Sequence, residues 1–212
     1  MLKTYRVNNI FHSVQGEGRN TGRASVFVRL AGCNLRCPFC DTGHERFQPM
    51  TAQQIAAQVA SFPDTARQLV VLTGGEPTLQ ADEQLVSAIK TLGCQVAMES
   101  NGTLPAPPNI DWLTLSPKST AIQLPLNTPY WKELKLVFTT ALQLEDLLEQ
   151  LARVHGPRWQ QFIDEAAWCA LQPCDTGQPQ RNAAIVKDCV DYVMRHPRWR
   201  LSLQIHKLIG IE

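Results

Sequence analysis

Three cysteines, Cys33, Cys37 and Cys40, stand within eight residues of one another. Thiolates at this spacing repel one another unless a cation holds them, so the loop predicts a metal site. A structural zinc ion takes four protein ligands, and His44 could supply the fourth. An iron–sulfur cluster is also held by four thiolates as a rule, so three would leave one iron open to a ligand that is not protein. The spacing leaves both interpretations open.

The remaining cysteines, of seven in all, are scattered at Cys94, Cys169, Cys174 and Cys189. Free cysteine is among the most buried residue types, so we expect them in the core, with the role of Cys174 in its polar stretch left open. Seven cysteines cannot form a complete set of disulfides, and the N-terminus lacks the apolar run of a secretory signal. We therefore expect a reduced, cytoplasmic protein without a membrane span.

Length and composition are those of an ordinary globular protein, with 212 residues, 44% of them hydrophobic and 18% charged. Lys and Arg nearly balance Asp and Glu, which leaves a formal net charge of +1. This balance argues against a large nucleic-acid surface, which needs a basic excess, but it allows a small anionic ligand. Because no repeat, low-complexity tract or long linker interrupts the chain, we expect one domain over residues 1–212.

Short apolar runs alternate with amphipathic segments along the chain, which is typical of an α/β protein. Strands are expected at 6–14, 25–30, 69–73, 94–98, 111–115, 133–138, 168–171 and 200–205. Helices are expected from about residue 51, over about 80–92, around 144–151 and over about 182–195. At the first helix, Thr51 and Gln54 fit a capping box.

Polar motifs follow six of these strands. They are the cysteine loop after 25–30, Thr73-Gly74-Gly75-Glu76-Pro77 after 69–73, Glu99-Ser100-Asn101-Gly102 after 94–98, Ser116-Pro117-Lys118 after 111–115, Gln172-Pro173 after 168–171 and His206-Lys207 after 200–205. In parallel sheets and barrels, ligand sites are built at the carboxyl ends of the strands. The six motifs therefore predict one site at a common edge of a parallel sheet.

Several of these motif residues allow more than one interpretation. Gly74 and Gly75 have no Cβ, so they would let a ligand approach the backbone closely. Glu76 offers a carboxylate at a strand end, either to bind a ligand ammonium or to cap the helix that follows, and the two weigh equally. His206 could be a core histidine, which is the commoner case, or a ligand contact.

Polar residues nearer the N-terminus are also candidates. Gln15 and Glu17 share a face if their strand continues, and together an amide and a carboxylate can read the donor and acceptor edge of a heterocycle. An ordinary glycine turn explains the same run. Arg29 falls in an apolar strand, where a guanidinium is costly unless paired, so we expect an internal glutamate or a carboxylated ligand beside it.

The cysteine triplet followed by Gly-Gly-Glu-Pro resembles the radical S-adenosylmethionine superfamily. Within it, further motifs resemble the 7-carboxy-7-deazaguanine synthase family, from about residue 10 to the C-terminus. These motifs are Gln15-Gly16-Glu17-Gly18, Arg29, Cys40-Asp41-Thr42, Ser116-Pro117-Lys118 and Gln204-Ile205-His206-Lys207. The resemblance implies an α/β fold, an incomplete (β/α) barrel with mostly parallel strands.

The resemblance also implies a radical lyase. Its three cysteines would hold three irons of a 4Fe-4S cluster, and the fourth iron would bind S-adenosylmethionine, whose cleavage gives a 5′-deoxyadenosyl radical. The implied reaction contracts the ring of 6-carboxy-5,6,7,8-tetrahydropterin, with loss of ammonia, to 7-carboxy-7-deazaguanine on the route to queuosine and related deazapurines. In this family S-adenosylmethionine is regenerated, and Mg²⁺ is required, with Thr42 matching its protein ligand.

Other roles carry over from the family position by position. The residues that match its substrate pocket are Gln15, Gly16, Glu17, Arg29, Thr73 and His206. Those that match S-adenosylmethionine contacts are Gly75, Ser116, Pro117, Lys118 and Gln172, with Glu76 and Ser100 beside them. The resemblance further implies a homodimer and a flavodoxin or ferredoxin as electron donor, and it leaves His44 without a metal to bind.

Two positions depart from the family pattern. Ile205 stands where the family often has threonine, and the chain ends Gly210-Ile211-Glu212. The C-terminus of the family can reach the substrate, so this contact is an open question here.

Two alternatives are weighed against this interpretation. A glycyl-radical-enzyme activase would share the cysteine loop but has no need for Gln15, Glu17, Thr42 or His206. A zinc-binding interaction module, built on the three loop cysteines and His44, is the alternative from a different class of protein.

Overall fold

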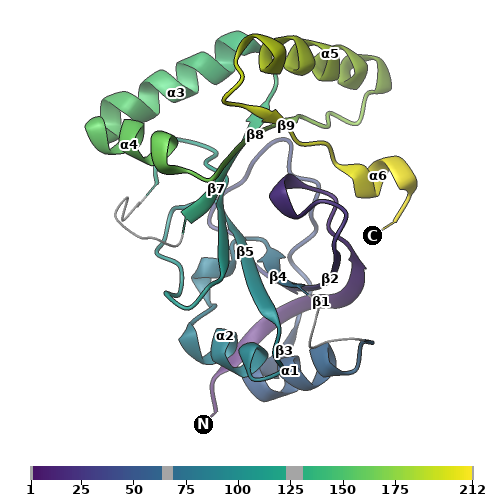
Figure 1. The fold of residues 1–212 in the computed structure, drawn as a ribbon. Coiled ribbons are helices and arrows are strands. Elements are labelled where there is room, and N and C mark those ends of the chain that lie inside the picture. The colour runs from purple at the N-terminus through teal and green to yellow at the C-terminus, as the bar shows by residue number, and fades with distance from the viewer. Residues whose placement is uncertain (1, 64–68, 123–130, 212) are drawn as a thin grey trace.

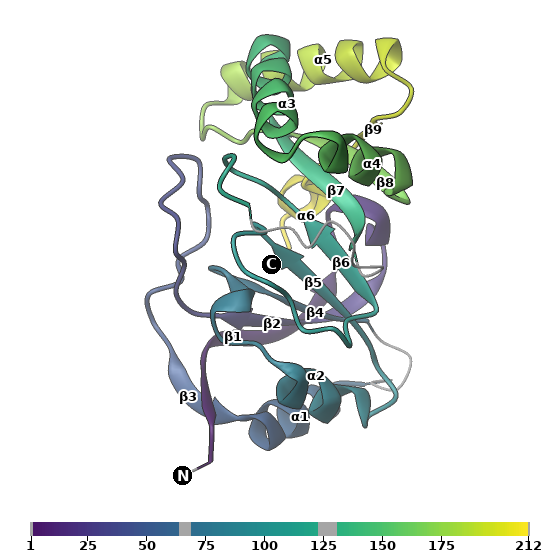
Figure 2. The ribbon, with the colours of Figure 1, turned by 90° about the vertical axis from the view of Figure 1, so that its left-hand side faces the viewer.

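One sheet of nine strands carries the fold in the part of the chain that the computed structural model describes, residues 2–63, 69–122 and 131–211. The strands lie in the order β3-β1-β2-β4-β5-β6-β7-β8-β9 (Figures 1 and 2). Their bounds are β1 Thr4–Val14, β2 Ala24–Leu30, β3 Gln48–Thr51, β4 Leu69–Gly74, β5 Gln95–Ser100, β6 Trp112–Leu115, β7 Trp131–Phe138, β8 Trp168–Pro173 and β9 Arg200–Leu201.

The sheet is parallel from β2 to β9, whereas β1 is antiparallel to both of its neighbours. The carboxyl ends of β2, β4, β5, β6, β8 and β9 therefore meet at one edge, which confirms the expectation from the polar motifs. A strand such as β4, buried continuously from Leu69 to Leu72, fits a parallel sheet that is covered on both faces. This arrangement is the expected mostly parallel α/β fold.

The helices pack on the sheet in two groups (Figures 1 and 2). Helices α1 (Ala52–Ala60) and α2 (Glu83–Lys90) pack on each other and on β1, β3 and β5. Helices α3 (Ala141–His155), α4 (Pro157–Glu165) and α5 (Pro179–Arg195) form the other group, over β7, β8 and β9. The short α6 (Ile205–Ile209) stands apart from both. No helix in the described ranges is long and apolar enough to cross a membrane.

Local sequence explains where the first helices begin. Thr51 accepts a hydrogen bond from the N–H of Gln54, whose side chain accepts one in return, so the predicted capping box is present. Asp82 caps α2 by accepting from the N–H of Leu85. The buried faces of both helices join one apolar core with the sheet.

The scattered cysteines lie in the core, as expected. Cys94, Cys169, Cys174 and Cys189 are each at most 6% exposed, and burial raises the pKa of all four thiols. Cys174, whose role the sequence left open, follows the end of β8 and borders the cavity described below.

Three elements differ from the expectation. The strand expected over 200–205 ends at Leu201, because the N–H of Ile205 bonds to the carbonyl of Gly16 and α6 begins there. Strand β3 was not expected, since its Gln-Pro-Met-Thr sequence has no apolar run; it forms by pairing with the outer edge of β1. Helix α4 was not expected either: Gly156, at a φ of 61°, ends α3, and Pro157 begins the next helix.

Candidate active site

A cavity of about 450 Å³ opens at the carboxyl edge of the sheet, between the cysteine loop, the β1–β2 turn and α6. Two of the residues considered in the sequence analysis do not border this cavity: Pro117, which is buried, and His44. All other site residues expected from the sequence line it, namely Gln15, Gly16, Glu17, Arg29, Cys33, Cys37, Cys40, Thr42, Thr73, Gly75, Glu76, Ser100, Ser116, Lys118, Gln172 and His206.

The three loop cysteines border this cavity as free thiols. Cys33 and Cys37 are half-buried and Cys40 is exposed. Burial raises the pKa of Cys37; the charge of Lys118 opposes this shift, and the charges of Cys40 and Cys33 add to it. Three adjacent thiolates thus favour a group with positively charged irons, so the donor set fits an iron–sulfur cluster.

The zinc alternative rests on His44, which lies in the same loop as the three cysteines. Within the described residues, no three His, Cys, Asp or Glu side chains are grouped so as to hold a single metal ion. His44 contributes only its backbone here, its carbonyl accepting from the N–H of Gly32 at 2.9 Å. An iron–sulfur cluster needs no common point for the three sulfurs, because each thiolate binds a different iron.

Gly74 and Gly75 permit a close approach of the chain's own backbone. A Cβ at Gly75 would lie 1.9 Å from the carbonyl oxygen of Gly32, and one at Gly74 would lie 2.0 Å from that of Leu30. The N–H of Gly75 donates to Leu30 at 3.0 Å, and the N–H of Glu76 donates to Gly32 at 2.9 Å. Because neither glycine has a Cβ, the end of β4 can hydrogen-bond directly to the backbone at the start of the cysteine loop.

The carboxylate of Glu76 is 1% exposed and is bound by four donors. Its Oε1 accepts from the N–H of Thr78 at 3.0 Å, from the Thr78 hydroxyl at 2.6 Å and from the Ser100 hydroxyl at 2.8 Å. Its Oε2 accepts from the N–H of Asn101 at 2.7 Å. Glu76 thus caps the 3-10 helix Pro77–Leu79, as one of the two interpretations predicted, and also joins β4 to the end of β5.

The ends of β6 and β8 place a cation and polar groups at the cavity. The ammonium of Lys118 donates to the Ser116 hydroxyl at 2.5 Å, and its charge acts on Cys37. Burial lowers the pKa of Lys118, and the charge of Lys135 acts in the same direction. Gln172 accepts from the Ser202 hydroxyl at 3.3 Å.

The turn after β1 packs directly on α6. The carbonyl of Gly16 accepts from the N–H of Ile205 at 3.1 Å. A Cβ at Gly16 would lie 2.3 Å from Nδ1 of His206, so this position has no room for a side chain. His206 is half-buried and borders the cavity, as does Ile211, whereas Glu212 lies outside the described residues.

Gln15 and Glu17 both border the cavity, but β1 ends at Val14, so they lie in the turn after it and not on one face of a continuing strand. The N–H of Glu17 donates to the side-chain oxygen of Gln15 at 3.1 Å. Glu17 Oε1 also accepts from the side-chain amide of Gln204 at 2.9 Å. A glycine turn and a polar pair are therefore both present in this run.

Arg29 and Thr73 lie side by side on β2 and β4 and border the same cavity. Arg29 is half-buried, and its guanidinium carbon lies 5.0 Å from the centre of the Phe11 ring, a cation–π contact. The cation is thus held beside the cavity, where an anionic ligand group would meet it.

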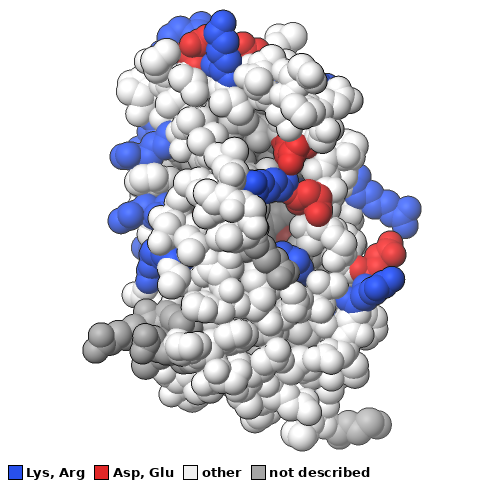
Figure 3. All heavy atoms as spheres, turned by 90° about the vertical axis from the view of Figure 1, so that its right-hand side faces the viewer, with Lys and Arg blue, Asp and Glu red and all other residues white. Residues whose placement is uncertain are grey.

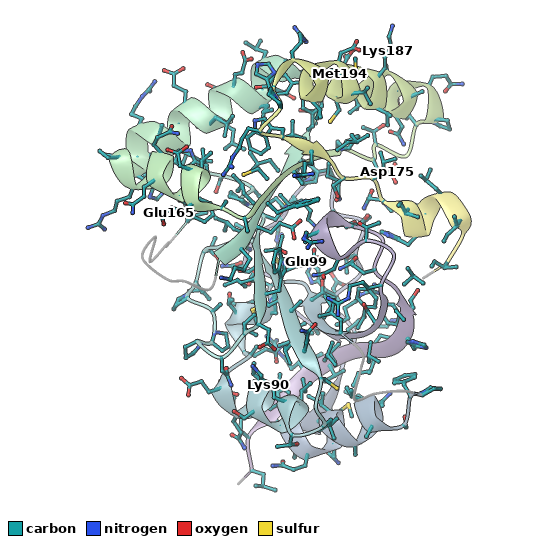
Figure 4. All side chains as sticks on the ribbon, in the orientation of Figure 1. Lys90, Glu99, Glu165, Asp175, Lys187 and Met194 are labelled. Carbon is teal, nitrogen blue, oxygen red and sulfur yellow. The ribbon has the colours of Figure 1, made fainter. Side chains whose placement is uncertain are left out.

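The sequence reasoning missed Lys135 and gave Glu99, named only as part of a polar motif, no role of its own. Lys135 on β7 is 4% exposed, and its ammonium lies 2.5 Å from Glu17 Oε2 and 2.7 Å from Glu99 Oε2. Figure 4 shows Glu99, near the end of β5, at the centre of the molecule. A lysine in an apolar strand carries the same signal as Arg29, since neither charge is buried without a partner.

This network controls the charge of Glu17. Burial alone would raise the pKa of Glu17, but the charge and hydrogen bond of Lys135, the hydrogen bond of Gln204 and the charge of His206 lower it to about 2. Burial alone would lower the pKa of Lys135, but Glu17 and Glu99 raise it. Glu17 is therefore an anion and Lys135 a cation at neutral pH.

Charged residues at the mouth join α6 to the cysteine loop. The ammonium of Lys207 lies 2.5 Å from Asp41 and 2.8 Å from Asp175, which Figure 4 shows beside α6. Thr42, next to Asp41, donates its hydroxyl to that carboxylate at 3.3 Å. Figure 3 looks onto the side that carries α6 and shows acidic and basic side chains gathered in its middle.

Comparison with known proteins defines the class first. The family model of the radical SAM superfamily matches residues 27–161, which include the cysteine loop and the Gly-Gly-Glu-Pro run. This match covers more than half of the chain. The fold and the three free thiols at the cavity thus define a radical S-adenosylmethionine protein, for which a 4Fe-4S cluster and S-adenosylmethionine are the implied cofactors.

Full-length relatives narrow the class. A protein of Bacteroides thetaiotaomicron named 7-carboxy-7-deazaguanine synthase is 42% identical over 207 residues, which cover 98% of each chain. Relatives of the same name from Bordetella pertussis and Bradyrhizobium diazoefficiens are 42% and 39% identical and cover 98% and 99% of this chain. The chain belongs to the 7-carboxy-7-deazaguanine synthase family.

Solved structures agree with this assignment. The structure of QueE from Escherichia coli matches with a TM-score of 0.74 at 25% identity, over 94% of this chain and 93% of the other. The structure of Streptococcus suis SuiB bound to the precursor peptide SuiA shares the fold at a TM-score of 0.55 and 13% identity, over 82% of this chain and 47% of the other. The fold, an incomplete barrel of the radical type, is thus confirmed, and the full-length relatives decide against the activase and the zinc module.

Proposed function

We propose that this chain converts 6-carboxy-5,6,7,8-tetrahydropterin to 7-carboxy-7-deazaguanine, contracting the ring with loss of ammonia, in queuosine biosynthesis. The observation that carries the proposal is the composition of the cavity at the carboxyl edge of the sheet. It brings the cysteine loop together with Gln15, Glu17, Arg29 and His206, groups suited to a small polar heterocycle with a carboxylate.

The cluster would be held by Cys33, Cys37 and Cys40. When bound, the reduced cluster and S-adenosylmethionine supply a 5′-deoxyadenosyl radical that removes a hydrogen atom from the substrate. The chain's own part is to hold, orient and exclude water. Its residues proposed to hold S-adenosylmethionine are Gly75, Glu76, Ser100, Ser116, Lys118 and Gln172, all at the cavity; Pro117, buried behind them, would act only by shaping the turn.

The substrate would occupy the part of the cavity between β2, β4 and α6, against Gln15, Gly16, Glu17, Arg29, Thr73 and His206. The guanidinium of Arg29 would face the carboxylate of the substrate. The Glu17 carboxylate, ionised at neutral pH, accepts hydrogen bonds only and so would select the N–H groups of the pterin ring.

Further parts of the proposal rest on the family resemblance. Thr42 would contribute an oxygen to Mg²⁺, with substrate and water completing the octahedron, and its place at the cavity beside Asp41 supports this role. We also propose a flavodoxin or ferredoxin as electron donor, a homodimer, and a cytoplasmic setting. The net charge of +1 supports a small-molecule enzyme that does not bind nucleic acid.

The deciding experiment is a product assay on the anaerobically reconstituted enzyme. Reduced protein is incubated with S-adenosylmethionine, Mg²⁺ and the carboxytetrahydropterin, and the products are identified by mass spectrometry. We expect 7-carboxy-7-deazaguanine from the wild type and from the core variant Cys94→Ala, and none from Cys37→Ala. Cleavage of S-adenosylmethionine without any deazaguanine would refute the proposed substrate.

The Mg²⁺ ligand is tested in the same assay. We expect Thr42→Ala to keep its cluster absorbance but to need more Mg²⁺ for the same rate. Equal Mg²⁺ dependence in the two proteins would contradict the assignment.

A further inference from the structure

Lys135 borders the cavity and forms ion pairs with two carboxylates. It lies on β7, is 4% exposed, and its ammonium is within 2.7 Å of two carboxylates from different elements, Glu17 after β1 and Glu99 on β5. These ion pairs use two of its three donors. The lysine therefore links elements that are not neighbours in the sheet.

Each of these carboxylates is held at both of its oxygens. Lys135 binds Oε2 of Glu17 and Oε2 of Glu99. The side-chain amide of Gln204 binds the other oxygen of Glu17 at 2.9 Å, and that of Gln15 binds the other oxygen of Glu99 at 3.1 Å. A carboxylate bound at both oxygens is held in one orientation, and the Lys135 ammonium contributes to the orientation of both Glu17 and Glu99.

The charges that face Glu17 come from several elements. On β7 the charge is Lys135, whose ammonium also pairs with Glu99 on β5. The others are Lys118 after β6, Asp41 in the cysteine loop and His206 on α6. Of these, Lys135 makes the only direct ion pair with Glu17 among the described residues. Without it, neither Glu17 nor Glu99 would have an ion-pair partner within the described ranges.

Stability of the fold does not explain a lysine at this position. Burying an ammonium and two carboxylates costs desolvation, and apolar side chains of the same size often stabilise a core more. A fully hydrogen-bonded network of this kind is better suited to holding Glu17 and Glu99 in a fixed geometry at a polar site.

We propose that Lys135 is a positioning residue of the substrate site, which acts on the substrate through Glu17 by holding that carboxylate and Glu99 in the orientation that the ligand meets. This inference rests on the proposed function, because it takes Glu17 as a substrate contact. It assigns Lys135 no step in the chemistry.

The first test measures binding without turnover. The reconstituted enzyme with bound S-adenosylmethionine, kept free of reductant, is titrated with the carboxytetrahydropterin at neutral pH. We expect Lys135→Met to raise the Kd of the substrate by about 10- to 100-fold, since a charge-assisted hydrogen bond to Glu17 is lost. The affinity for S-adenosylmethionine should change much less, because Lys135 hydrogen-bonds to the two carboxylates and reaches the proposed cofactor contact Lys118 only through its charge.

The matched control is Lys90→Met. Lys90 also pairs with a carboxylate, Asp111, at 2.7 Å, but on the surface at the end of α2 and away from the cavity (Figure 4). Substrate affinity should be unaffected in this variant.

The second test is a double-mutant cycle. If Lys135 acts through Glu17, adding Lys135→Met to Glu17→Gln should weaken binding by no more than about twofold beyond Glu17→Gln alone. The double variant also removes a buried negative charge with the buried positive one, so it remains measurable even if Lys135→Met alone does not fold. A full, additive loss in the double variant would overturn the inference.

A pH series gives a readout that a purely structural role would not move. Without the ammonium the pKa of Glu17 rises, so the ratio of the substrate Kd of Lys135→Met to that of the wild type should grow as pH falls from about 8 to about 5. Effects of His206 and of the substrate's own groups are common to both proteins and cancel in this ratio. Lys135→Arg retains the charge and should keep the ratio constant.

Failure of this inference and failure of the proposed function are distinguishable. If the wild type neither binds nor converts the pterin, the proposed function is wrong. If the wild type does both and Lys135→Met binds equally well at every pH, the positioning role is wrong while the function stands.

Discussion

The carboxylate of Glu76, a residue of the Gly-Gly-Glu-Pro motif, is held in place by hydrogen bonds from the protein itself. Four donors from three residues bind it, and it is 1% exposed. Any ligand that meets Glu76 therefore meets a group that the protein already holds in place. Removing its side chain would leave the buried Asn101 N–H and Ser100 hydroxyl without this acceptor.

We expect Glu76→Ala to lower the free energy of unfolding by about 2–3 kcal/mol, the cost of losing hydrogen bonds to a buried charged group. Urea unfolding of the protein measures this loss. Glu83→Ala, at an exposed glutamate in the first turn of α2, is the matched control and should change the free energy by less than about 0.5 kcal/mol. Equal losses in the two variants would show that the four hydrogen bonds add nothing.

Among the elements of the fold, helix α6 is held against the rest of the protein mainly by polar contacts. None of its five residues is buried, and Leu208 and Ile209 are largely exposed. The N–H of Ile205 donates to the carbonyl of Gly16, and the side chain of Gln204, the N-cap, donates to Glu17. Lys207 forms ion pairs with Asp41 and Asp175 at the mouth of the cavity. The wall that α6 gives to the cavity thus depends on a few directional bonds.

We expect Lys207→Met to raise the rate of hydrogen exchange in residues 205–211 by about threefold or more, because local opening of α6 loses two ion pairs. The free energy of global unfolding should change by less than about 1 kcal/mol, since both pairs are partly exposed. Exchange measured by mass spectrometry, with Lys3→Met as the control, tests this. Lys3 pairs with Asp82 at 2.5 Å on another surface. Unchanged exchange in α6 would contradict the proposed attachment.

At the scale of the whole molecule, the ionised carboxylates make the free energy of unfolding depend on pH. The folded state lowers the pKa of Glu17 and Asp175 to about 2 and also lowers that of Asp41 and Asp82. Groups with a lowered pKa stabilise the fold above their unfolded pKa and lose this effect as pH falls. Glu133 is the exception among the carboxylates with a clear shift in the described part of the chain: burial raises its pKa, so it acts in the opposite direction.

We therefore expect the free energy of unfolding to fall as pH is lowered from about 5 towards about 2. Urea unfolding at several pH values across this range measures it. In Glu17→Gln the slope should be smaller, because one of the groups that take up protons has been removed. A free energy that is constant or rises towards low pH would contradict the assignment of these shifts.

Much of the arrangement could be predicted because its signals are local. The capping box at Thr51, the apolar runs of β2 and β4 and the polar motifs behind the strands are each read from a few neighbouring residues. Parallel pairing then brings the motifs to one edge without further information. The three cysteines are the clearest case, since their spacing alone pointed to a metal.

The missed features depend on residues distant in the chain. Lys135 lies 118 residues from Glu17 and 36 from Glu99, and no local pattern shows that the three meet. The end of β9 was missed for the same reason, since Ile205 bonds to Gly16 at the opposite end of the chain. At Gly74 and Gly75 the small residues were noticed, but the partner turned out to be the backbone of Leu30 and Gly32.

The meeting of Gln204 with Glu17, across 187 residues of sequence, also sets an order of events during protein synthesis. A ribosome makes the turn after β1 and the cysteine loop well before α6. A nascent chain therefore displays its three thiols while one wall of the pocket does not yet exist. Iron–sulfur assembly can reach the growing chain at that stage, but the pocket is complete only after α6 has been made.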